Sequence, residues 1–198
     1  MSKTRTARIA TAARKTKETD IRVQLNLDGT GQHQISTGIP FFDHMLAQLA
    51  KHGYMDLDVQ AKGDLEIDGH HTVEDVGLVL GSALREALGD RSGIVRFAHA
   101  YVPLDEALTR VVIDLSGRPY LVYNVEFKAA RIGDLQSELV EEFAKAFVQE
   151  GRFNLHIENL YGRNQHHISE TIFKAMARAL HLATRVQYEG VPSTKGVL

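Results

Sequence analysis

The chain contains one short pattern twice, and the two copies lie 96 residues apart. His70–Asp75 reads HHTVED and His166–Thr171 reads HHISET. A longer stretch also repeats, at an offset of 88 residues: ETDIRVQLNLDGTG at Glu18–Gly31 matches EALTRVVIDLSGRP at Glu106–Pro119. Self-similarity at a nearly constant spacing indicates a duplicated folding unit. The 198 residues are therefore expected to form two similar halves, which we place at residues 1–92 and 93–198.

Each half is predicted to contain three strands, a helix, a fourth strand and a last helix that begins at the HHxxE pattern. The expected strands are Thr6–Ala13, Asp20–Leu27, Gln32–Thr37 and Leu57–Ala61, and then Ile94–Tyr101, Thr109–Leu115, Tyr120–Phe127 and Phe153–Glu158. The first helices are expected at Phe41–His52 and Leu135–Glu150, closed by Gly53 and Gly151. Asp28-Gly29 and Ser116-Gly117 are typical of hairpin turns. This order predicts an α+β fold of two βββαβα halves, with mostly antiparallel sheets packed against helices.

The spacing inside the repeated pattern is that of metal ligands on a helix. Residues four positions apart share one helical face, so His70 lies beside Glu74 and His166 beside Glu170. Adjacent histidines point about 100° apart, so one pair does not readily hold a single ion. The repeat therefore indicates two metal ions, each shared between distant parts of the chain or between subunits. The alternative is that these histidines simply begin two amphipathic helices.

The duplication also relates the first helices of the two halves. Aligning Gly53 with Gly151 places Glu142 opposite His44. If His44 is a ligand, Glu142 is the expected ligand at the equivalent position of the other site.

Composition excludes several classes of partner. A formal charge of −2 gives no general affinity for nucleic acid. No apolar run approaches the roughly 18 residues of a membrane span, and the basic N-terminus lacks the apolar segment of a secretory signal. The chain has no cysteine, so a metal would need imidazole and carboxylate ligands, and a reducing, cytoplasmic location is expected.

Several long motifs, in order, resemble the imidazoleglycerol-phosphate dehydratase family. They are FFDHMLAQLAKHG, DLEIDGHHTVEDVG, YVPLDEALTRVVIDLSGRPYLV, NQHHISETIFKAMARAL and the terminal STKGVL. The resemblance covers about Arg8 to Leu198 and implies an enzyme of histidine biosynthesis. Such an enzyme is a carbon–oxygen lyase that converts imidazole glycerol phosphate to imidazole acetol phosphate.

The resemblance implies two Mn²⁺ ions per active site, at subunit interfaces of a 24-chain homo-oligomer. Other divalent transition metals would accept the same ligands. By position, one ion would be held by His44, His71, His166 and Glu170, and the other by His70, Glu74, His167 and Glu142. Position 142 departs from the family pattern, in which a histidine is expected. Glu142 is predicted to retain the site with altered affinity, and the alternative is a solvated glutamate beside a water ligand.

The resemblance also implies groups that contact the substrate. Glu18 is the leading candidate for the base, with Glu170 and His52 as rivals and Glu74 as a further catalytic candidate through its metal. The residues expected to bind phosphate or lie near it are Arg96, Arg118, Ser193, Thr194, Lys195, Gln48 and Lys174. The tail VPSTKGVL is predicted to close over the phosphate as a mobile lid. Glu106, the repeat partner of Glu18, receives no role.

The implied reaction needs an unusual electron sink. It breaks a carbon–hydrogen bond that has no adjacent carbonyl group, so the imidazole ring of the substrate must accept electrons, and a metal at a ring nitrogen favours this. Two other classes would use similar ligands: a two-metal hydrolase of phosphate esters and a non-enzymatic, metal-organised assembly protein. The hydrolase would need a water nucleophile, and the assembly protein would leave the arginines and the STKG tail without a purpose.

Overall fold

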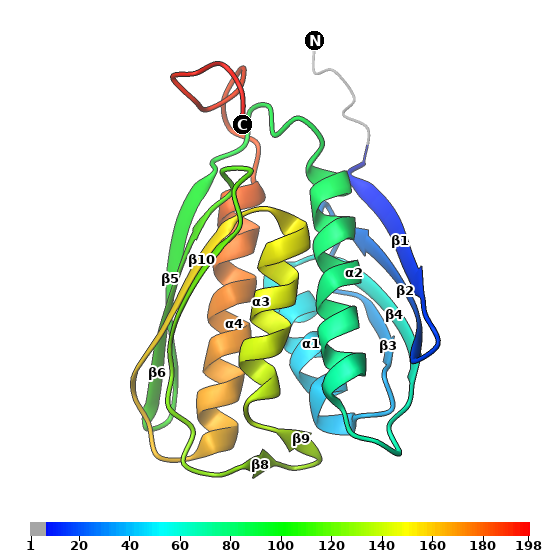
Figure 1. Cartoon of the computed structure of the whole chain (residues 1–198). Coiled ribbons are helices and arrows are strands. Elements are labelled where there is room, and N and C mark those ends of the chain that lie inside the picture. The colour runs from blue at the N-terminus through cyan, green and yellow to red at the C-terminus, as the bar shows by residue number, and fades with distance from the viewer. Residues whose placement is uncertain (1–6) are drawn as a thin grey trace.

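The computed structural model describes residues 7–198 and has three layers, with a sheet on either side of a layer of helices (Figure 1). The first half contains strands β1 (Ile9–Lys15), β2 (Thr19–Asn26), β3 (His33–Ser36) and β4 (Asp56–Gly63), and helices α1 (Pro40–Gly53) and α2 (His70–Leu88). Its chain order is βββαβα, as predicted. Thr6, the first residue of the first predicted strand, lies outside the described residues.

The second half repeats this order with one addition. It contains β5 (Phe97–Leu104), β6 (Ala107–Asp114), β7 (Tyr120–Asn124), α3 (Leu139–Gly151), β10 (Asn154–Tyr161) and α4 (Gln165–Thr184). Between β7 and α3 lies a small hairpin of β8 (Arg131–Ile132) and β9 (Leu135–Gln136). The predicted start of the third helix at Leu135 is therefore wrong, because Leu135 pairs with Ile132 in this hairpin.

The two sheets have equivalent strand orders, β1-β2-β4-β3 and β5-β6-β10-β7. In each sheet the last pair is parallel and the others are antiparallel, which agrees with the predicted mixed fold. The hairpins predicted at Asp28-Gly29 and Ser116-Gly117 are wrong. In each half the fourth strand inserts between the second and the third, so these turns begin crossovers, and the true hairpins join β1 to β2 and β5 to β6.

The helices of the two halves interleave. Helix α1 packs on α4, and α2 packs on α3. The first helix of each half therefore packs on the last helix of the other half. Aromatic rings join them in the core: Phe143 of α3 lies 5.5 Å from Phe42 of α1 and 5.4 Å from Phe173 of α4, between ring centroids. All three rings are buried. This exchange of helices brings the first helix of each half beside the HHxxE pattern of the other.

Glycines set the close contact between α2 and α3. A Cβ atom at Gly81 would lie 2.6 Å from the carbonyl oxygen of Phe147 and 2.7 Å from the backbone nitrogen of Gly151. Glycine was also expected to be the left-handed cap of α1 and α3. The two helices do end at Gly53 and Gly151, but the left-handed caps are the next residues, Tyr54 and Arg152, both at φ 52°.

The segment after α4 continues along the start of the second half. Val186 forms an antiparallel bridge with Ile94, and the backbone nitrogen atoms of Gln187 and Tyr188 donate to the carbonyl oxygen of Gly93. The C-terminal segment therefore lies at the end of the molecule where α2 and α4 finish (Figure 1). Within residues 7–198, no helix has the length and apolar character needed to cross a membrane.

Candidate active site

Three of the predicted ligands meet between α1 and α4. Nε2 of His44 lies 2.8 Å from Oε1 of Glu170, and Nε2 of His166 lies 3.0 Å from the same oxygen. Helical periodicity places His166 and Glu170 on one face, and the packing of α1 on α4 brings His44 to them. The three donor atoms lie within 4.8 Å of one another, and this is the only such group among the described residues.

The surroundings of Glu170 keep it ionised. Burial raises the pKa of Glu170, but hydrogen bonds from Lys174, His44 and His166 outweigh burial and lower the pKa to about 2. Lys174 pairs with Oε2, so the two carboxylate oxygens have different partners. The group is thus a permanent carboxylate with two imidazoles on one oxygen, which is a donor set that suits a divalent transition metal.

Gln48 and His52 continue this group along α1. The Gln48 side chain lies 3.4 Å from Nε2 of His44 and 3.0 Å from Nε2 of His52. Burial lowers the pKa of His52, and the charges of Lys174 and Arg178 lower it further. His52 is therefore a neutral imidazole near neutral pH, able to accept a proton.

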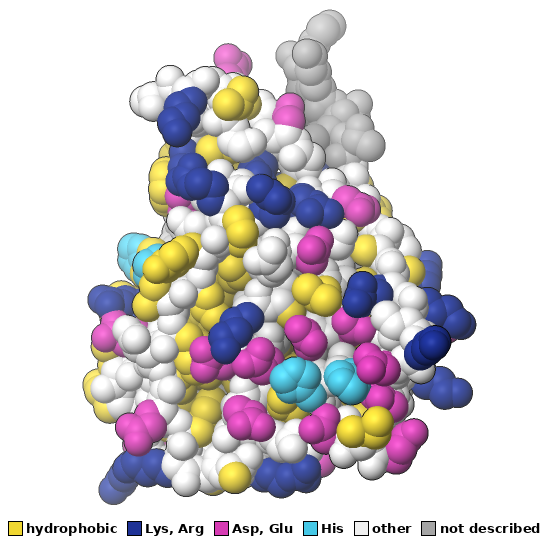
Figure 2. Space-filling model, in the orientation of Figure 1, with side chains coloured by type: hydrophobic (Ala, Val, Ile, Leu, Met, Phe, Trp, Pro, Cys, Tyr) yellow, Lys and Arg dark blue, Asp and Glu magenta, His cyan; other side chains and the backbone are white. Residues whose placement is uncertain are grey.

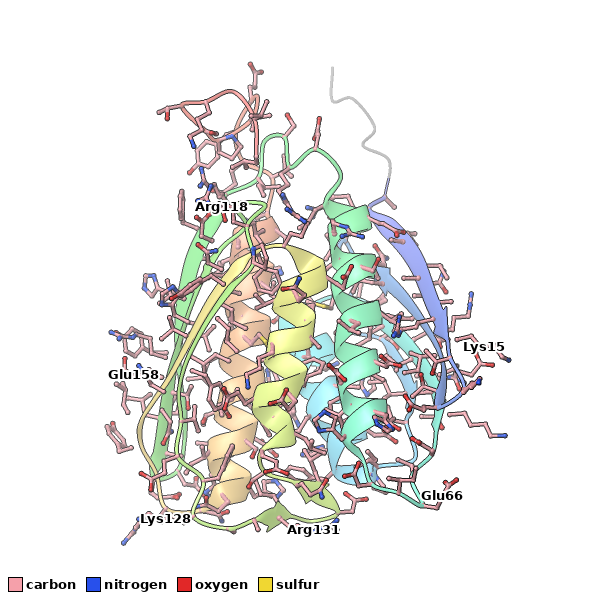
Figure 3. The ribbon with its side chains drawn as sticks, in the orientation of Figure 1. Lys15, Glu66, Arg118, Lys128, Arg131 and Glu158 are labelled. Atoms are coloured by element: carbon pink, nitrogen blue, oxygen red, sulfur yellow. The ribbon has the colours of Figure 1, made fainter. Side chains whose placement is uncertain are left out.

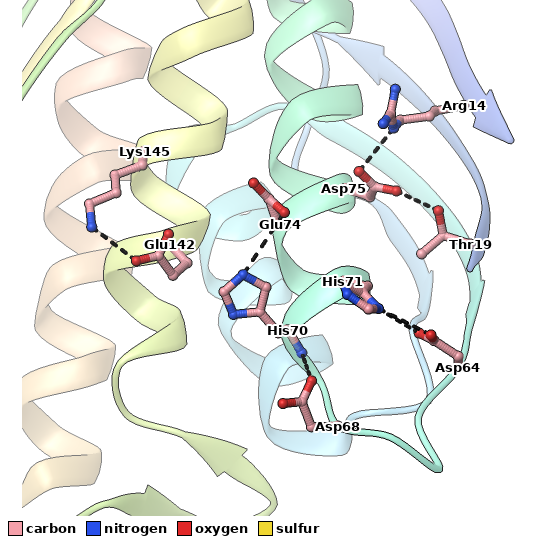
Figure 4. Close-up of polar contacts among 10 residues, drawn as sticks. All are labelled: Arg14, Thr19, Asp64, Asp68, His70, His71, Glu74, Asp75, Glu142 and Lys145. Carbon is pink, nitrogen blue, oxygen red and sulfur yellow. Dashed lines mark hydrogen bonds and ion pairs between the residues drawn. The ribbon is translucent and has the colours of Figure 1, made fainter. Parts of the chain in front are cut away.

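The first HHxxE pattern is more open. Nε2 of His70 lies 3.9 Å from Oε2 of Glu74, one turn later on α2. Glu142 projects from the neighbouring helix α3, and its Oε1 accepts a hydrogen bond from Lys145 at 2.9 Å (Figure 4). Helix α3 packs on α2 as α1 packs on α4, so Glu142 and His44 lie on equivalent helices. Within residues 7–198 Glu142 forms no hydrogen bond or ion pair with His70 or Glu74.

The second histidine of each pattern is held apart from these groups. Nδ1 of His71 lies 3.1 and 3.2 Å from the two carboxylate oxygens of Asp64 (Figure 4), and Nδ1 of His167 lies 2.8 Å from Oε2 of Glu106. The hydrogen bond to Asp64 raises the pKa of His71. His71 therefore does not join His44, His166 and Glu170 within one chain, and His167 does not join His70 and Glu74.

Glu18 lies in the turn between β1 and β2, and its carboxylate has no hydrogen-bond or ion-pair partner among residues 7–198. The turn itself is fixed. Thr16 Oγ1 accepts from the backbone nitrogen atoms of Glu18 and Thr19, and Thr19 donates through Oγ1 to Asp75 of α2 at 2.5 Å. Arg14 also binds Asp75, at 2.9 Å (Figure 4). A free carboxylate is therefore presented on a turn that is anchored to α2.

The residues expected at the phosphate line one hollow of about 930 Å³ at the other end of the molecule. Its lining includes Arg96, Arg118, Ser193, Thr194 and Lys195, together with Arg91 and Arg152. The side chain of Arg118 has no hydrogen-bond or ion-pair partner within the described part of the chain. Five cations line this hollow, of which Arg96 pairs with Asp114 at 2.8 Å, and their excess positive charge favours an anion such as phosphate. Gln48 and Lys174 are not part of this lining; they lie beside His44 and Glu170.

The histidines and the cationic hollow lie far apart in one chain. Figure 2 shows two adjacent histidines among acidic side chains in the lower half of that face, whereas several basic side chains gather at the upper end. Figure 3 places Arg118 beside the C-terminal segment and Glu66, in the loop before α2, at the opposite end. Helix α4 has 20 residues between these ends, which corresponds to about 30 Å. A small phosphate ester cannot span that distance.

Sequence reasoning missed five residues of these groups. Phe41 packs its ring edge-on against His166 at 5.2 Å between centroids, Asp64 and Glu106 hold histidines, and Arg91 and Arg152 enlarge the cationic hollow. The general tendency of ligand histidines to donate their second N–H to a carboxylate was the available signal for Asp64 and Glu106. Their distances from His71 and His167 in the chain, 7 and 61 residues, follow no common spacing.

Comparison with known proteins gives one consistent result. The family model described as imidazoleglycerol-phosphate dehydratase matches residues 37–180. The chain is 58% identical to the imidazoleglycerol-phosphate dehydratase of Thioalkalivibrio sulfidiphilus over 194 residues, covering 96% of this chain and 98% of that protein. The corresponding protein of Magnetococcus marinus is 57% identical over 195 residues, covering 97% and 98%.

Two solved structures are similar over nearly the whole chain. The imidazoleglycerol-phosphate dehydratase of Staphylococcus aureus aligns with a TM-score of 0.82 at 38% identity and covers 90% of this chain and 99% of that one. The protein from Pyrococcus furiosus aligns with a TM-score of 0.83 at 40% identity, covering 94% and 99%. The arrangement of two sheets around four helices is thus shared with these proteins.

Proposed function

The chain belongs to the imidazoleglycerol-phosphate dehydratase family, and we propose that it performs this dehydration with two divalent metal ions held between copies of the chain. The reaction is a step of histidine biosynthesis, in which imidazole glycerol phosphate loses water to give imidazole acetol phosphate. The observation that carries the metal part of the proposal is the convergence of His44, His166 and Glu170.

The donor atoms present fit a transition metal. Ligand atoms lie about 2 Å from such an ion, so atoms within 4.8 Å of one another need only a small adjustment to share it. Imidazole nitrogen with carboxylate oxygen suits Mn²⁺. We propose His44, His71, His166 and Glu170 for one ion and His70, Glu74, His167 and Glu142 for the other. When bound, the two ions would supply Lewis-acid stabilisation of negative charge on the imidazole ring of the substrate.

Two features support a site completed by other subunits. First, His71 and His167 stand apart from the groups they would join within one chain. Second, the cationic hollow lies at the end opposite to the histidines, about 30 Å away along α4. One copy would supply the hollow to the histidines of another, and the acidic side chains around the histidines (Figure 2) complement the charge of the cationic hollow. A closed homo-oligomer, for which we propose 24 chains, satisfies both requirements.

The chain's own residues would then bind the substrate and move protons. Arg96, Arg118, Ser193, Thr194 and Lys195 would hold the phosphate group through charge-assisted hydrogen bonds. Glu18, whose carboxylate has no hydrogen-bond or ion-pair partner in the described chain, would remove the carbon-bound proton. Neutral His52 is the rival base, because its pKa is lowered by burial and by the charges of Lys174 and Arg178. Glu170 is less suited to this role, because its pKa of about 2 makes it a weak base.

The test compares substrates, metals and variants. Purified protein with Mn²⁺ should dehydrate imidazole glycerol phosphate, should lose that activity on exhaustive chelation, and should not hydrolyse p-nitrophenyl phosphate. Arg96→Ala and Lys195→Ala should raise the KM. Hydrolysis of the generic ester without dehydration would favour a two-metal hydrolase. Dehydration that survives chelation would contradict the metal proposal, and activity unchanged in both variants would contradict the phosphate site.

We also propose that the enzyme works in the cytoplasm. The absence of cysteine from all 198 residues is compatible with a reducing compartment, and the substrate is a charged metabolite. Fractionation of cells that express the full chain would test this, and recovery outside the cytoplasm would contradict it.

A further inference from the structure

The two histidine pairs have the same internal geometry. The ring centroids of His70 and His71 are 6.2 Å apart with an interplanar angle of 86°, and those of His166 and His167 are also 6.2 Å apart at 86°. In each pair the first histidine lies near the glutamate one turn later on its own helix, and the second binds a carboxylate from another element. In both halves, therefore, the first histidine lies near a glutamate of its own helix and the second is bound to a carboxylate from outside that helix.

The carboxylate decides which nitrogen of the second histidine carries the proton. An ionised carboxylate only accepts hydrogen bonds, so the short contacts of Asp64 and Glu106 require a proton on Nδ1. A neutral imidazole with its proton on Nδ1 keeps its lone pair on Nε2. That lone pair is what a metal ion binds.

We propose that Asp64 and Glu106 are equivalent positioning residues, which hold His71 and His167 with the proton on Nδ1 and so leave Nε2 of each as a metal ligand. This inference rests on the proposed function, because it takes both histidines as ligands. The proposal assigns a role to Glu106, for which the sequence predicted none. It assigns the same role to Asp64, although Asp64 and Glu106 are not equivalent positions of the repeat.

The carboxylate of Glu106 is itself held in place, and the loop that carries Asp64 is fixed through its backbone. Glu106 lies in the turn between β5 and β6 and accepts from the backbone nitrogen atoms of Arg163 at 3.0 Å and Asn164 at 2.6 Å, just before α4. Its other oxygen, Oε2, lies 2.8 Å from Nδ1 of His167, so three contacts fix this carboxylate. Asp64 lies in the loop before α2, where its carbonyl oxygen accepts from the backbone nitrogen of Ile67 at 2.9 Å.

The two halves reach this arrangement by different residues, and the difference has a consequence for Glu18. Glu106 matches Glu18 at the repeat offset of 88 residues, but the position that matches Asp64 at the offset of 96 is Leu160. In the second half the glutamate of the hairpin must therefore hold the histidine. In the first half Asp64 does so, and the Glu18 carboxylate forms no hydrogen bond or ion pair among the described residues, although its charge acts on His71. This frees Glu18 for proton transfer.

The test measures histidine tautomers and metal affinity in the full chain. Protein labelled with nitrogen-15 in histidine is prepared as wild type, Asp64→Asn and Glu106→Gln. The matched controls are Asp58→Asn and Glu158→Gln, whose carboxylates bind Gln60 and Arg110 on outer sheet faces. An amide can donate to Nδ1, so we expect the protons of His71 and His167 to shift toward Nε2 only in the first two variants. The dissociation constant of Mn²⁺ should rise roughly 10- to 100-fold in these variants and stay unchanged in the controls.

Conservative variants separate positioning from a general structural role. Asp64→Glu and Glu106→Asp retain the carboxylate and should recover the Nδ1 tautomer and part of the Mn²⁺ affinity. Wild-type tautomers together with wild-type affinity in Asp64→Asn and Glu106→Gln would overturn the inference, as would an equal loss in the controls. Failure of the wild-type enzyme to dehydrate its substrate would instead refute the proposed function, since the tautomers are read without turnover.

Discussion

Nε2 of His44 and Oε1 of Glu170 lie 2.8 Å apart, although 126 residues separate them in the chain. The contact joins α1 of the first half to α4 of the second, and it exists because the halves exchange helices. His166 binds the same oxygen from one turn earlier on α4. One carboxylate oxygen of Glu170 thus contacts an imidazole from each half of the duplicated fold.

Replacing Glu170 by glutamine should weaken metal binding and activity together. The amide loses the charge that Lys174, His44 and His166 now stabilise, and it is a poor ligand for a hard cation. We expect the Mn²⁺ dissociation constant to rise at least roughly tenfold, the lower limit typical of disturbed metal sites. Titration with Mn²⁺ and turnover of imidazole glycerol phosphate measure both effects. Glu158→Gln is the control, and full metal content with normal turnover in Glu170→Gln would refute the assignment.

Replacing Glu18 by glutamine should affect turnover without affecting the metal. The carboxylate has no hydrogen-bond or ion-pair partner in residues 7–198, so its loss breaks no such contact. If Glu18 is the base, kcat should fall by about 10²- to 10⁴-fold, the range for general acid–base groups, while Mn²⁺ affinity stays the same. Glu86→Gln, at the far end of α2, should match wild type. A normal kcat in Glu18→Gln would transfer the role to His52.

Alanine at Gly81 should destabilise the protein. Its Cβ would meet the backbone of α3 at 2.6 and 2.7 Å, and backbone atoms cannot rotate away as a side chain can. Overpacking of this kind costs about 1–3 kcal/mol. Thermal unfolding of Gly81→Ala and of the neighbouring Ser82→Ala, on the partly exposed face of α2, measures the effect. Equal melting temperatures for the two variants would contradict the close packing of α2 on α3.

Asp56 should stabilise the fold in a pH-dependent way. Burial raises its pKa, but hydrogen bonds from the backbone of Thr30 and Gln32 and from the side chain of Asn26 outweigh burial and lower the pKa below 3.8. A carboxyl group whose pKa is lower in the folded state contributes stability above its unfolded pKa, and the contribution is lost as the pH falls through the folded pKa. Asp56→Asn should therefore cost about 1 kcal/mol at neutral pH and less at pH 2, and the cost is modest because the group is partly exposed. Denaturant unfolding at both pH values tests this, and an equal cost at both would contradict it.

The sequence predicted those features that depend on local pattern. The alternation of buried and exposed residues in β2 and β6 gives strands, and the HHxxE spacing gives the starts of α2 and α4 within one residue or so. The predicted hairpins failed for a non-local reason: nothing near Asp28 signals that β4, thirty residues later, will insert between β2 and β3. The small β8–β9 hairpin was missed because two-residue strands carry no periodicity.

In the candidate site, too, features that depend on local spacing could be predicted, and features that depend on tertiary packing could not. His166 and Glu170 share a face because of helical spacing, whereas the ligand role of Glu142, which rests on the alignment of the helix ends, stays a prediction. The partners of His71 and His167 could not be predicted, because Asp64 and Glu106 come from loops whose positions depend on the packing of whole sheets. The separation of the cationic hollow from the histidines likewise follows only from the direction of α4.

Mixing two defective variants tests the shared active site most directly. Glu170→Gln damages the metal group and Arg118→Ala damages the cationic hollow, so each alone should be nearly inactive. If a site takes these parts from different copies, co-assembly from equal amounts should restore wild-type sites in about one quarter of positions by random assortment in a symmetric oligomer. We predict turnover near a quarter of the wild-type value after unfolding and refolding the variants together. Turnover no greater than the sum of the separate variants, in oligomers shown to contain both chains, would contradict the account.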